Sequence, residues 1–351
     1  MDPGGMAKLN LVQILPEFEE GGVERHVLWL ANELARRGHR VMVISAGGKL
    51  ESLLDNVCHW KLPVHKKNPL TGLYCAICIA HRARKEGWQI LHSHSRVPSW
   101  IAWWASSISG IPWVATCHAR YSLNKGLIPY RYAKNCICVS EVVRKHLNSF
   151  LCGEPRVIYN GLQGDASSWT LQKDHQLCKF LFVGRLTRIK GIELLLNVLP
   201  DIQGPWRLDI LGEGALLTRL KDFIHDADLE RKVFFHGFRD DVDKWMDNCS
   251  FLLFPSLDEG MPLTLCRAIQ KGVPLLASDI PAVRELTGGS VRLFRSGDPS
   301  ALKTLIRQAM AGDPEDFICP YRKIPSIEDM TKEIEEVYSE NVSRLSAPGF
   351  C

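Results

Sequence analysis

The stretch "LNLVQILPEFEEGGVERHVLWLANELARRGHRVMVIS", residues 9–45, decides the fold class. It opens with a largely apolar run, 9–15, which is typical of a parallel strand buried on both faces. Apolar residues then recur every three or four positions as far as Leu34, and this spacing predicts an amphipathic helix. Gly38 ends the helix, and a second apolar run follows at 40–45. Strand, helix and strand in this order predict a parallel α/β unit.

The alternation of strand and helix signals continues along the chain, with a change of composition in the middle. Residues 161–176, "GLQGDASSWTLQKDHQ", are polar and show no periodicity, which indicates a boundary between two domains. Each side carries its own apolar runs, so two doubly wound parallel sheets in tandem are predicted. We expect further strands at 90–94, 113–118, 135–140 and 156–160 before this segment, and at 179–186, 206–214, 232–238, 250–256 and 273–279 after it.

The predicted organisation is therefore two Rossmann-like domains followed by a final helix. Ser326 is well placed to cap that helix, because a serine hydroxyl can accept from the free amides of a first turn. We assign residues 6–162 to the first domain, 163–176 to a linker, 177–325 to the second domain and 326–345 to the C-terminal helix.

The composition is that of an ordinary globular protein, with 351 residues, 46% hydrophobic and 23% charged. The net charge of +4 is too small to indicate nucleic-acid binding, although it tolerates an anionic ligand or membrane surface. We expect no signal peptide, and Met6 as the natural start. The most apolar stretch, 99–115, is interrupted at Pro112, so it predicts a buried helix and a strand rather than a membrane-spanning helix.

Twelve cysteines are scattered along the chain and raise the question of a metal site. Cys75 and Cys78 form one CxxC, but a zinc site of this type needs a second pair. Cys136 and Cys138 would face one side of a strand. Buried small apolar residues are the favoured interpretation, in a reducing, cytoplasmic compartment.

A basic motif, "FVGRLTRIKGIELLL" at 182–196, marks the first strand end of the second domain. Arg185 and Lys190 follow a buried strand and precede a helix that begins near Ile192. Two cations beside a helix amino end suit a diphosphate, because Arg binds oxygens bidentately and Lys adds a point charge. A solvated basic loop is the alternative.

A second motif, "LDEGMPLTLCRAI" at 257–269, combines a carboxylate with a helix start. Gly260 lets the backbone approach a ligand, and Pro262 suits the first turn of a helix. Glu259 would repel a phosphate, so we expect it to accept hydrogen bonds from sugar hydroxyls; a helix-capping carboxylate is the alternative. The anion cradle beside it would consist of the amides of Met261, Leu263 and Thr264.

The first domain carries weaker signals at its own strand ends. Gly21 and Gly22 precede a helix whose free amides could meet a phosphate, although a simple strand–helix turn explains them equally well. His118 lies at a strand end, where a catalytic and a structural role are about equally expected. We expect His92 and His94, at strand spacing, to line the cleft without acting as ligands.

The order of these motifs resembles the retaining glycosyltransferases of family 4, of the type that makes bacterial cell-surface polysaccharide or lipopolysaccharide. The resemblance rests on GG before a helix, "GRLTRIKG", "LGEG", "HGF" and "PSLDEGMPLTL", and covers roughly residues 8–342. It implies the α/β GT-B fold, in which two Rossmann-like doubly wound domains face a central cleft and the last helix crosses back to the first domain. It also implies transfer from a nucleotide-diphosphate sugar, UDP-sugar favoured, with no metal and no cofactor. The acceptor would be a glycan or a lipid-linked glycan, and no nucleic acid is expected as a partner.

The resemblance also implies roles for individual residues. Arg185 and Lys190 would bind the donor diphosphate, Glu259 would hold hydroxyls of the donor sugar, and His118 would sit beside the transferred sugar. These four are the expected catalytic residues, and the loop at Gly21 and Gly22 would close over the donor phosphates. The other expected donor contacts are Gly184, Gly212, Gly237, Phe238, Gly260, Met261, Pro262, Leu263, Thr264 and Arg267.

One position departs from the family pattern. The family commonly has a second Glu eight residues after the first, in contact with the ribose, and here that position is Arg267. Arg267 could contact a phosphate, pair with an acidic residue, or leave the ribose contact to water. We expect it about two helical turns from Glu259, near the same face. The acidic "DDVD", 240–243, mimics a metal-binding motif, but we expect it to cap a helix.

Two other functions fit the same architecture. A nucleotide-sugar 2-epimerase would need acids and bases around the second carbon of the sugar, and a non-catalytic nucleotide-sugar-binding protein is suggested only by Arg267. Basic segments at 34–40, 65–67 and 81–85 could attract an anionic membrane surface, although solvated helix ends explain them equally well. We expect a cytoplasmic protein, with a peripheral position on the inner face of the cytoplasmic membrane as a further hypothesis.

Overall fold

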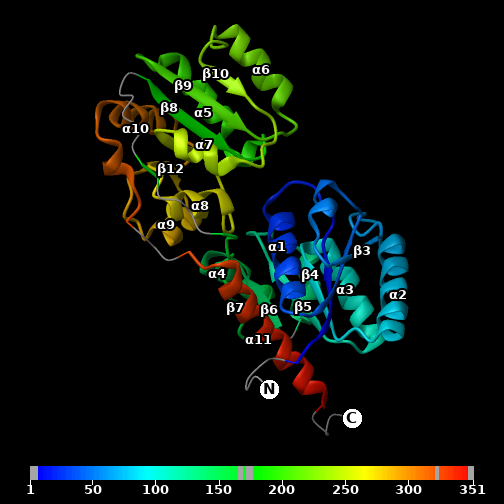
Figure 1. Ribbon diagram of the computed structural model, residues 1–351. Coiled ribbons are helices and arrows are strands. Elements are labelled where there is room, and N and C mark those ends of the chain that lie inside the picture. Colours follow the sequence, from blue (N-terminus) through cyan, green and yellow to red (C-terminus); the bar gives the residue numbers. More distant parts are fainter. Residues whose placement is uncertain (1–6, 134, 165–168, 171–176, 321–323, 347–351) are drawn as a thin grey trace. The chain divides into compact units, whose positions relative to one another are not determined.

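The computed structural model describes residues 7–133, 135–164, 169–170, 177–320 and 324–346. The chain divides into two compact units. Unit 1 comprises Met1–Gln163 together with Pro325–Cys351, and unit 2 comprises Gly164–Ile324 (Figure 1). Each unit is a parallel sheet with helices packed on it, so the predicted α/β fold of two Rossmann-like domains is confirmed.

Unit 1 contains a seven-stranded sheet in the order β3-β2-β1-β4-β5-β6-β7. All neighbouring strands are parallel, and the order reverses between β1 and β4, which creates a topological switch point. The edge strand β3 was not predicted, because its short run is half exposed and lacks an apolar pattern. The strands are β1 Asn10–Ile14, β2 Arg40–Ser45, β3 Cys58–Lys61, β4 Ile90–His94, β5 Trp113–Cys117, β6 Asn135–Cys138 and β7 Arg156–Val157.

The helices of unit 1 pack on this sheet or on one another through buried apolar residues. In α1 the buried positions include Val27, Leu30 and Leu34, which share one core with Ile334 and Val337 of the last helix. The helices are α1 Gly22–Arg36, α2 Pro69–Glu86, α3 Arg96–Ser109, α4 Glu141–Leu147 and α11 Ile327–Ser346, with 3₁₀ turns at Lys49–Leu53, Lys125–Arg131 and Asn148–Phe150.

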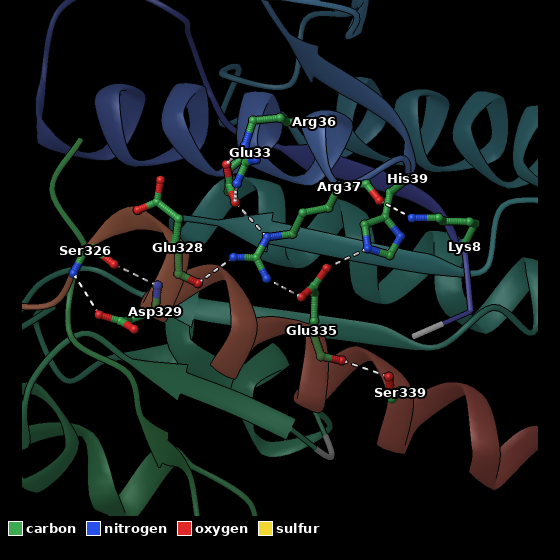
Figure 2. Close-up of polar contacts among 10 residues, drawn as sticks. All are labelled: Lys8, Glu33, Arg36, Arg37, His39, Ser326, Glu328, Asp329, Glu335 and Ser339. Atoms are coloured by element: carbon green, nitrogen blue, oxygen red, sulfur yellow. Dashed lines mark hydrogen bonds and ion pairs between the residues drawn. The ribbon is translucent and has the colours of Figure 1, made fainter. Parts of the chain in front are cut away.

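The last helix, α11, is fixed to unit 1 by polar contacts as well as by its apolar face (Figure 2). Glu335 accepts from Arg37 Nη1 at 2.8 Å and lies 2.7 Å from His39 Nε2. Burial alone would raise the pKa of Glu335, but hydrogen bonds from His39 and Arg37 outweigh it and lower that pKa. Ser326 caps the helix as predicted: its Oγ accepts from the amide of Asp329, whose carboxylate accepts from the Ser326 amide in return.

Unit 2 contains a six-stranded parallel sheet in the order β10-β9-β8-β11-β12-β13, with its switch point between β8 and β11. The strands are β8 Cys178–Val183, β9 Trp206–Leu211, β10 Val233–Phe235, β11 Phe251–Phe254, β12 Leu275–Asp279 and β13 Leu293–Arg295. The helices are α5 Ile192–Val198, α6 Leu217–Asp226, α7 Val242–Asn248, α8 Leu263–Lys271, α9 Pro281–Thr287 and α10 Pro299–Ala311, with 3₁₀ turns at Arg188–Lys190, Leu199–Asp201 and Pro314–Phe317.

The predicted linker, 163–176, lies mostly outside the described residues, as does Met6. Trp169, which is described, packs on unit 2: its amide donates to the carbonyl of Lys271 at 2.7 Å and its Nε1 to the carbonyl of Cys249 at 3.0 Å. At least this part of the polar segment is therefore docked on unit 2 rather than solvated.

The most apolar stretch forms α3 and β5, as predicted. Within the described ranges, no helix combines the length and the apolar character needed to cross a membrane.

The described cysteines are unbridged, and several behave as buried small apolar side chains. Burial raises the pKa of the Cys75 thiol to about 11 and that of Cys266 to about 12, which keeps both as neutral thiols. Cys136 and Cys138 are also buried, and no described group of potential metal ligands includes a cysteine. The interpretation as small core residues therefore fits better than a thiolate metal site.

Candidate functional site

The predicted site residues fall into two sets, one in each unit. In unit 1, the predicted His94 of β4 and His118 directly after β5 lie at the carboxyl ends of neighbouring strands, beside Gln13 of β1, which was not predicted. In unit 2, Lys190 and Glu259 lie in the segments that follow β8 and β11, on the two sides of the switch point. Ligands of open α/β sheets bind at this edge.

Lys190 and Glu259 lie side by side in unit 2. Lys190 Nζ is 2.6 Å from Glu259 Oε1, and the two side chains keep 22% and 12% of their surface exposed. Gly191 makes this approach feasible, because a Cβ at this position would lie 1.9 Å from the carbonyl oxygen of Pro255. Its φ of +68° also favours glycine. The glycine after Lys190 therefore lets the turn that follows β8 press against the segment that follows β11.

Other predicted glycines hold the strand ends of unit 2 together. Gly212 has φ +131°, and a Cβ there would lie 2.1 Å from the carbonyl oxygen of Gly184. The Gly212 amide donates to the carbonyl of Gly237 at 2.7 Å, so the ends of β8, β9 and β10 are joined through the main chain. Phe238 follows with a partly exposed ring. Close packing explains these glycines, and donor binding by them stays a prediction.

The start of α8 has the form that the sequence predicted for an anion cradle. Gly260, Met261 and Pro262 are buried, and the helix begins at Leu263 with Thr264 in its first turn. Pro262, the residue before the helix, provides no side-chain cap, and the first main-chain amides of the helix are directed along its axis. The nine-residue helix follows Glu259 by only a few residues, so the carboxylate and the helix start belong to one short segment.

The remaining predicted phosphate contacts also lie at loop starts. Arg185 is exposed immediately after Gly184, and its side chain makes no hydrogen bond or ion pair with the described residues. Gly21 is the residue before α1, whose first residue is Gly22, and as a glycine it offers no side-chain cap; the Glu24 carboxylate of the first turn lies against it. These positions are compatible with anion binding, and nothing in the structure assigns a ligand to them.

Arg267 is held by an acidic residue of the neighbouring helix. Its Nε donates to Asp243 Oδ1 at 2.8 Å and its Nη2 pairs with the other carboxylate oxygen. The Nη1 group donates to Gln270 Oε1 at 2.8 Å and to the carbonyl of Gly164 at 3.3 Å. The Arg267 guanidinium lowers the pKa of Asp243. Of the three alternatives, pairing with an acidic residue is therefore the contact that the structure contains.

Two expectations about this region are wrong. Glu259 lies in the loop before α8, so it and Arg267 are not two turns apart on one helix. The acidic motif does not cap α7 through a side chain: Asp241 is the residue before the helix, but its carboxylate binds Arg239 instead. Asp243 binds Arg267, so each of these carboxylates has an arginine partner that the local pattern did not reveal.

His118 belongs to a chain of hydrogen bonds across the carboxyl edge of the unit 1 sheet. His118 Nε2 is 2.9 Å from His94 Nδ1, and His94 Nε2 is 2.8 Å from Gln13 Oε1. Gln13 Nε2 donates to the Tyr338 hydroxyl at 2.9 Å, and that hydroxyl is 2.6 Å from His92 Nδ1. His92 and His94 are fully buried parts of this network, so the expectation that they line a cleft is wrong.

A further histidine, His26 of α1, was missed by the sequence analysis. Its Nδ1 is 2.9 Å from Asn160 Oδ1, and its ring lies edge-on to His118 with centroids 4.8 Å apart. Burial lowers the pKa of His26 to about 4, against a smaller opposing effect of the Asn160 hydrogen bond. Burial and the neighbouring imidazoles lower the pKa of His94 and of His118 as well. All three rings are therefore neutral near pH 7.

The two sets differ in what they can do chemically. The Lys190 ammonium and the Glu259 carboxylate offer one cation and one hydrogen-bond acceptor beside an uncapped helix start, which suits a ligand with both anionic and hydroxyl groups. Neutral His118 can exchange hydrogen bonds with a ligand but carries no charge to stabilise an anion.

Both halves of the chain match known families of one class. Residues 20–163 match the family described as Glycosyltransferase Family 4, and residues 178–311 match the family described as Glycosyl transferases group 1. The chain is a glycosyltransferase of the family 4 type. The two matches meet near the boundary between the units, so each unit of this glycosyltransferase corresponds to one of the two families.

Individual relatives and a solved structure agree with this assignment. The glycosyltransferase is 28% identical to an uncharacterized glycosyltransferase of Methanocaldococcus jannaschii, over 82% of this chain and 84% of the relative. It is 24% identical to the lipopolysaccharide 1,6-galactosyltransferase of Escherichia coli, over 54% of this chain and 55% of the relative. The solved structure of Anabaena HepE in complex with UDP and glucose shares the fold with a TM-score of 0.76 and 18% identity, covering 94% of this chain and 100% of that one.

Proposed function

We propose that this glycosyltransferase moves a hexose from a nucleotide-diphosphate sugar, UDP-sugar favoured, to a glycan or lipid-linked acceptor in the synthesis of cell-surface polysaccharide or lipopolysaccharide, in the cytoplasm. The carrying observation is the Lys190–Glu259 pair beside the start of α8. Relatives named as lipopolysaccharide and O-antigen glycosyltransferases support the acceptor class. HepE, solved with UDP and glucose, supports the donor class.

In the proposed reaction the anomeric configuration is retained. The bond between the anomeric carbon and the diphosphate oxygen breaks, and the acceptor hydroxyl oxygen forms a new bond to that carbon on the same face. The acceptor proton passes to the departing diphosphate, so no metal ion and no cofactor enter the balance. Charge grows on the diphosphate as the bond breaks, and this is the charge that positioned donors stabilise best.

Lys190 and Glu259 would bind different groups of the donor. An ammonium group has three donors, so Lys190 can keep its hydrogen bond to Glu259 and still donate to the diphosphate. Glu259 accepts from sugar hydroxyls with its remaining lone pairs, while the amides of Leu263 and Thr264 face the diphosphate. Arg185, which is exposed, adds a second cation, and neutral His118 contacts the transferred sugar.

Nucleotide diphosphate release tests the proposal. Purified protein is screened by thermal shift against nucleotide sugars, and the best donor is incubated with acceptor glycolipid in the presence and absence of a chelator. We expect acceptor-dependent release of the nucleotide diphosphate that chelation does not reduce, and a product whose anomeric proton has the donor's configuration. Release of an epimerised sugar nucleotide would indicate the 2-epimerase instead, and calorimetric binding without turnover would indicate a binding protein.

We also propose that α2 docks on an anionic membrane surface that carries the acceptor. One face of this helix exposes Leu70, Leu73, Tyr74 and Ile77, with Leu70 79% exposed. Exposed basic residues flank this apolar face on both sides: Lys66 and Lys67 before it, Arg84 and Lys85 after it. An apolar stripe between cations matches an interface of acyl chains and anionic headgroups, where each cation contributes about 1 kcal/mol.

Sedimentation with vesicles tests the membrane proposal. We expect wild-type protein to sediment with anionic vesicles at low ionic strength, and salt to weaken this binding. Leu70→Ser combined with Ile77→Ser should reduce it strongly, whereas Leu123→Ser, at an exposed leucine elsewhere in unit 1, should not. Equal binding by both variants would exclude α2 as the docking face.

A further inference from the structure

Three histidine rings of unit 1 meet at one point. His26 of α1, His94 of β4 and His118 after β5 each offer a ring nitrogen, and these three nitrogens lie within 4.8 Å of one another. His26 Nε2 is buried and has no hydrogen-bond partner within the described residues. A buried polar atom without a partner is costly, so this nitrogen requires an explanation. Core packing alone does not supply one.

The hydrogen bonds around the cluster fix which ring nitrogens carry lone pairs. The Asn160 side-chain oxygen accepts from His26 Nδ1, which leaves the lone pair on His26 Nε2. Gln13 Oε1 accepts from His94 Nε2, which leaves the lone pair on His94 Nδ1. His118 Nε2 lies 2.9 Å from that nitrogen, so the single proton between these two rings belongs to His118.

This arrangement has the parts of a three-histidine metal site. Neutral imidazoles are the preferred ligands of divalent zinc, copper, nickel and iron. Asn160 and Gln13 accept from the outer nitrogens of His26 and His94, as the orienting partners of metal-bound histidines commonly do. His118 meets the ion by moving its ring proton from Nε2 to Nδ1, so no carboxylate or thiolate is needed.

The three ring nitrogens have to move slightly closer together to bind one ion. With metal–nitrogen bonds of about 2.0–2.1 Å in a tetrahedron, ligand nitrogens lie about 3.4 Å apart. His94 and His118 already approach more closely than this, while all three ligand nitrogens of the cluster lie within 4.8 Å of one another. His118 is only half-buried and follows the end of β5, so it is the ring best able to move inward. Solvent access at His118 also leaves room for water as a fourth ligand.

We propose that His26, His94 and His118 bind one divalent transition-metal ion of the zinc class, and that this ion inhibits the enzyme. This metal site has no part in the proposed reaction, which needs no metal. The inhibitory consequence rests on the proposed function, because His118 is there the residue that contacts the transferred sugar. An ion that occupies the His118 lone pair would remove this contact.

A cobalt titration tests the site without any activity measurement. Co²⁺ bound tetrahedrally by three imidazoles gives intense visible d–d absorption, whereas the hexaaquo ion gives almost none. The titration uses full-length protein carrying Cys58→Ser and Cys152→Ser, which removes the two exposed thiols among the described cysteines. We expect one saturable site with a tetrahedral spectrum, and displacement of cobalt by one equivalent of Zn²⁺.

Variants assign the ligands. His26→Gln and His118→Gln should each weaken cobalt binding at least tenfold and abolish the tetrahedral spectrum. His225→Gln, which changes an exposed histidine of unit 2, should change neither. Should His26→Gln fail to fold, His118→Gln decides alone, because its half-buried ring can be replaced with less disruption. Absence of a saturable spectrum, or its persistence in His118→Gln, overturns the site.

The inhibitory role has its own readout. We expect Zn²⁺ to suppress donor turnover in wild type at the concentrations that displace cobalt, with recovery on chelation. A metal that binds with the expected spectrum while turnover is unaffected retains the site and refutes inhibition. A protein that binds cobalt but turns over no nucleotide sugar refutes the proposed function and not the metal site.

Discussion

The two units present different chemistry at corresponding places in similar sheets. At the carboxyl edge of unit 1, buried neutral histidines are linked through Gln13 and Tyr338 into one network. In unit 2, the Lys190–Glu259 pair lies next to the switch point with both side chains partly exposed. A buried neutral network specifies geometry but adds little charge, whereas an exposed ion pair can exchange its partner for a ligand. We therefore expect unit 1 to be the more rigid site and unit 2 to bind anions more readily.

The largest expected effect comes from removing the cation of unit 2. Lys190→Ala should lower donor turnover about 100- to 1000-fold, because in the proposed reaction Lys190 is a positioned donor to the departing diphosphate. Arg185→Ala should have a similar but smaller effect, since the Arg185 side chain is exposed. Release of nucleotide diphosphate under saturating donor gives the rates.

Arg188→Ala is the matched control for these variants. Arg188 is two residues from Lys190, is 77% exposed and contacts only the surface residue Glu193 among the ion pairs of the described chain. Its loss should leave the rate within twofold of wild type. If Lys190→Ala and Arg188→Ala reduced turnover equally, a diffuse basic loop would replace the specific phosphate site.

Acid is expected to distinguish the two units, because it should lower the stability of unit 1 more than that of unit 2. His26 has a pKa of about 4 in the fold and 6.5 when exposed, so the unfolded chain binds more protons between these values. Stability contributed by the neutral ring is complete above pH 6.5 and is lost as the pH falls toward 4, by about 3 kcal/mol for this group. Glu335, whose pKa is lowered, adds a loss of the same sign at still lower pH.

Hydrogen exchange with peptide resolution measures this difference. After correction for the intrinsic pH dependence of exchange, protection of β4 should fall steadily from pH 6.5 to 4, while β11 of unit 2 should change less. His225→Gln should not alter the profile, because that exposed histidine has its pKa raised by Glu230 and titrates outside the cluster. Constant protection of β4 down to pH 4 would contradict burial of neutral rings as the cause.

The fold class could be predicted from the sequence because the central strands of both sheets are apolar runs that have to be buried. Segments such as 90–94 and 113–118 correspond to β4 and β5 within one residue. Edge strands β3 and β13 were missed, since half-exposed strands of three or four residues carry little apolar signal.

The residues of the candidate site could be predicted from the sequence, but the contacts between them could not. Lys190 and Glu259 were each identified from local pattern, yet their mutual contact depends on Gly191 and the carbonyl of Pro255, far apart in the sequence. Tyr338 reaches the histidine network from the last helix, 325 residues after Gln13. Such contacts are set by topology, and no periodicity within a window reports them.

Glu259→Gln tests whether Lys190 and Glu259 bind different parts of the donor. The amide still accepts from Lys190 but loses the charge-assisted hydrogen bond to sugar hydroxyls, so nucleotide-sugar affinity should fall by about 1.5–3 kcal/mol. Affinity for the bare nucleotide diphosphate should stay equal or rise, because Lys190 is no longer neutralised by a carboxylate. Calorimetry with both ligands measures the two changes.

Glu193→Gln is the control for that carboxylate, since Glu193 pairs with arginines at the surface of unit 2. It should leave both affinities unchanged. An equal weakening of both ligands by Glu259→Gln would indicate that this carboxylate only supports the loop, and the sugar-site assignment would be wrong.

The smallest expected effect concerns Arg267, where the family pattern has a glutamate. Arg267 is tied to Asp243, which is 44% exposed, so a double-mutant cycle with Arg267→Ala and Asp243→Ala should give a coupling of at most about 1 kcal/mol in urea unfolding. The more exposed pair between Arg284 of α9 and Asp279, the last residue of β12, provides a reference cycle, expected to give less.

Arg267→Glu tests whether the departure is functional. It places a carboxylate against Asp243, so it should destabilise unit 2 more than Arg267→Ala does, and Asp243→Arg in the same chain should restore most of the loss. Because Arg267 is hydrogen-bonded to Asp243 of α7, to Gln270 and to the carbonyl of Gly164, we interpret it as a structural residue and expect transfer to persist in Arg267→Glu. Preference between nucleotides can shift, since a glutamate could accept from ribose hydroxyls where a guanidinium cannot. Abolished turnover in a stably folded Arg267→Glu, Asp243→Arg protein would instead make this arginine part of the donor site, and the contrast between a structural ion pair at Arg267 and a ligand-exchanging one at Lys190 would no longer hold.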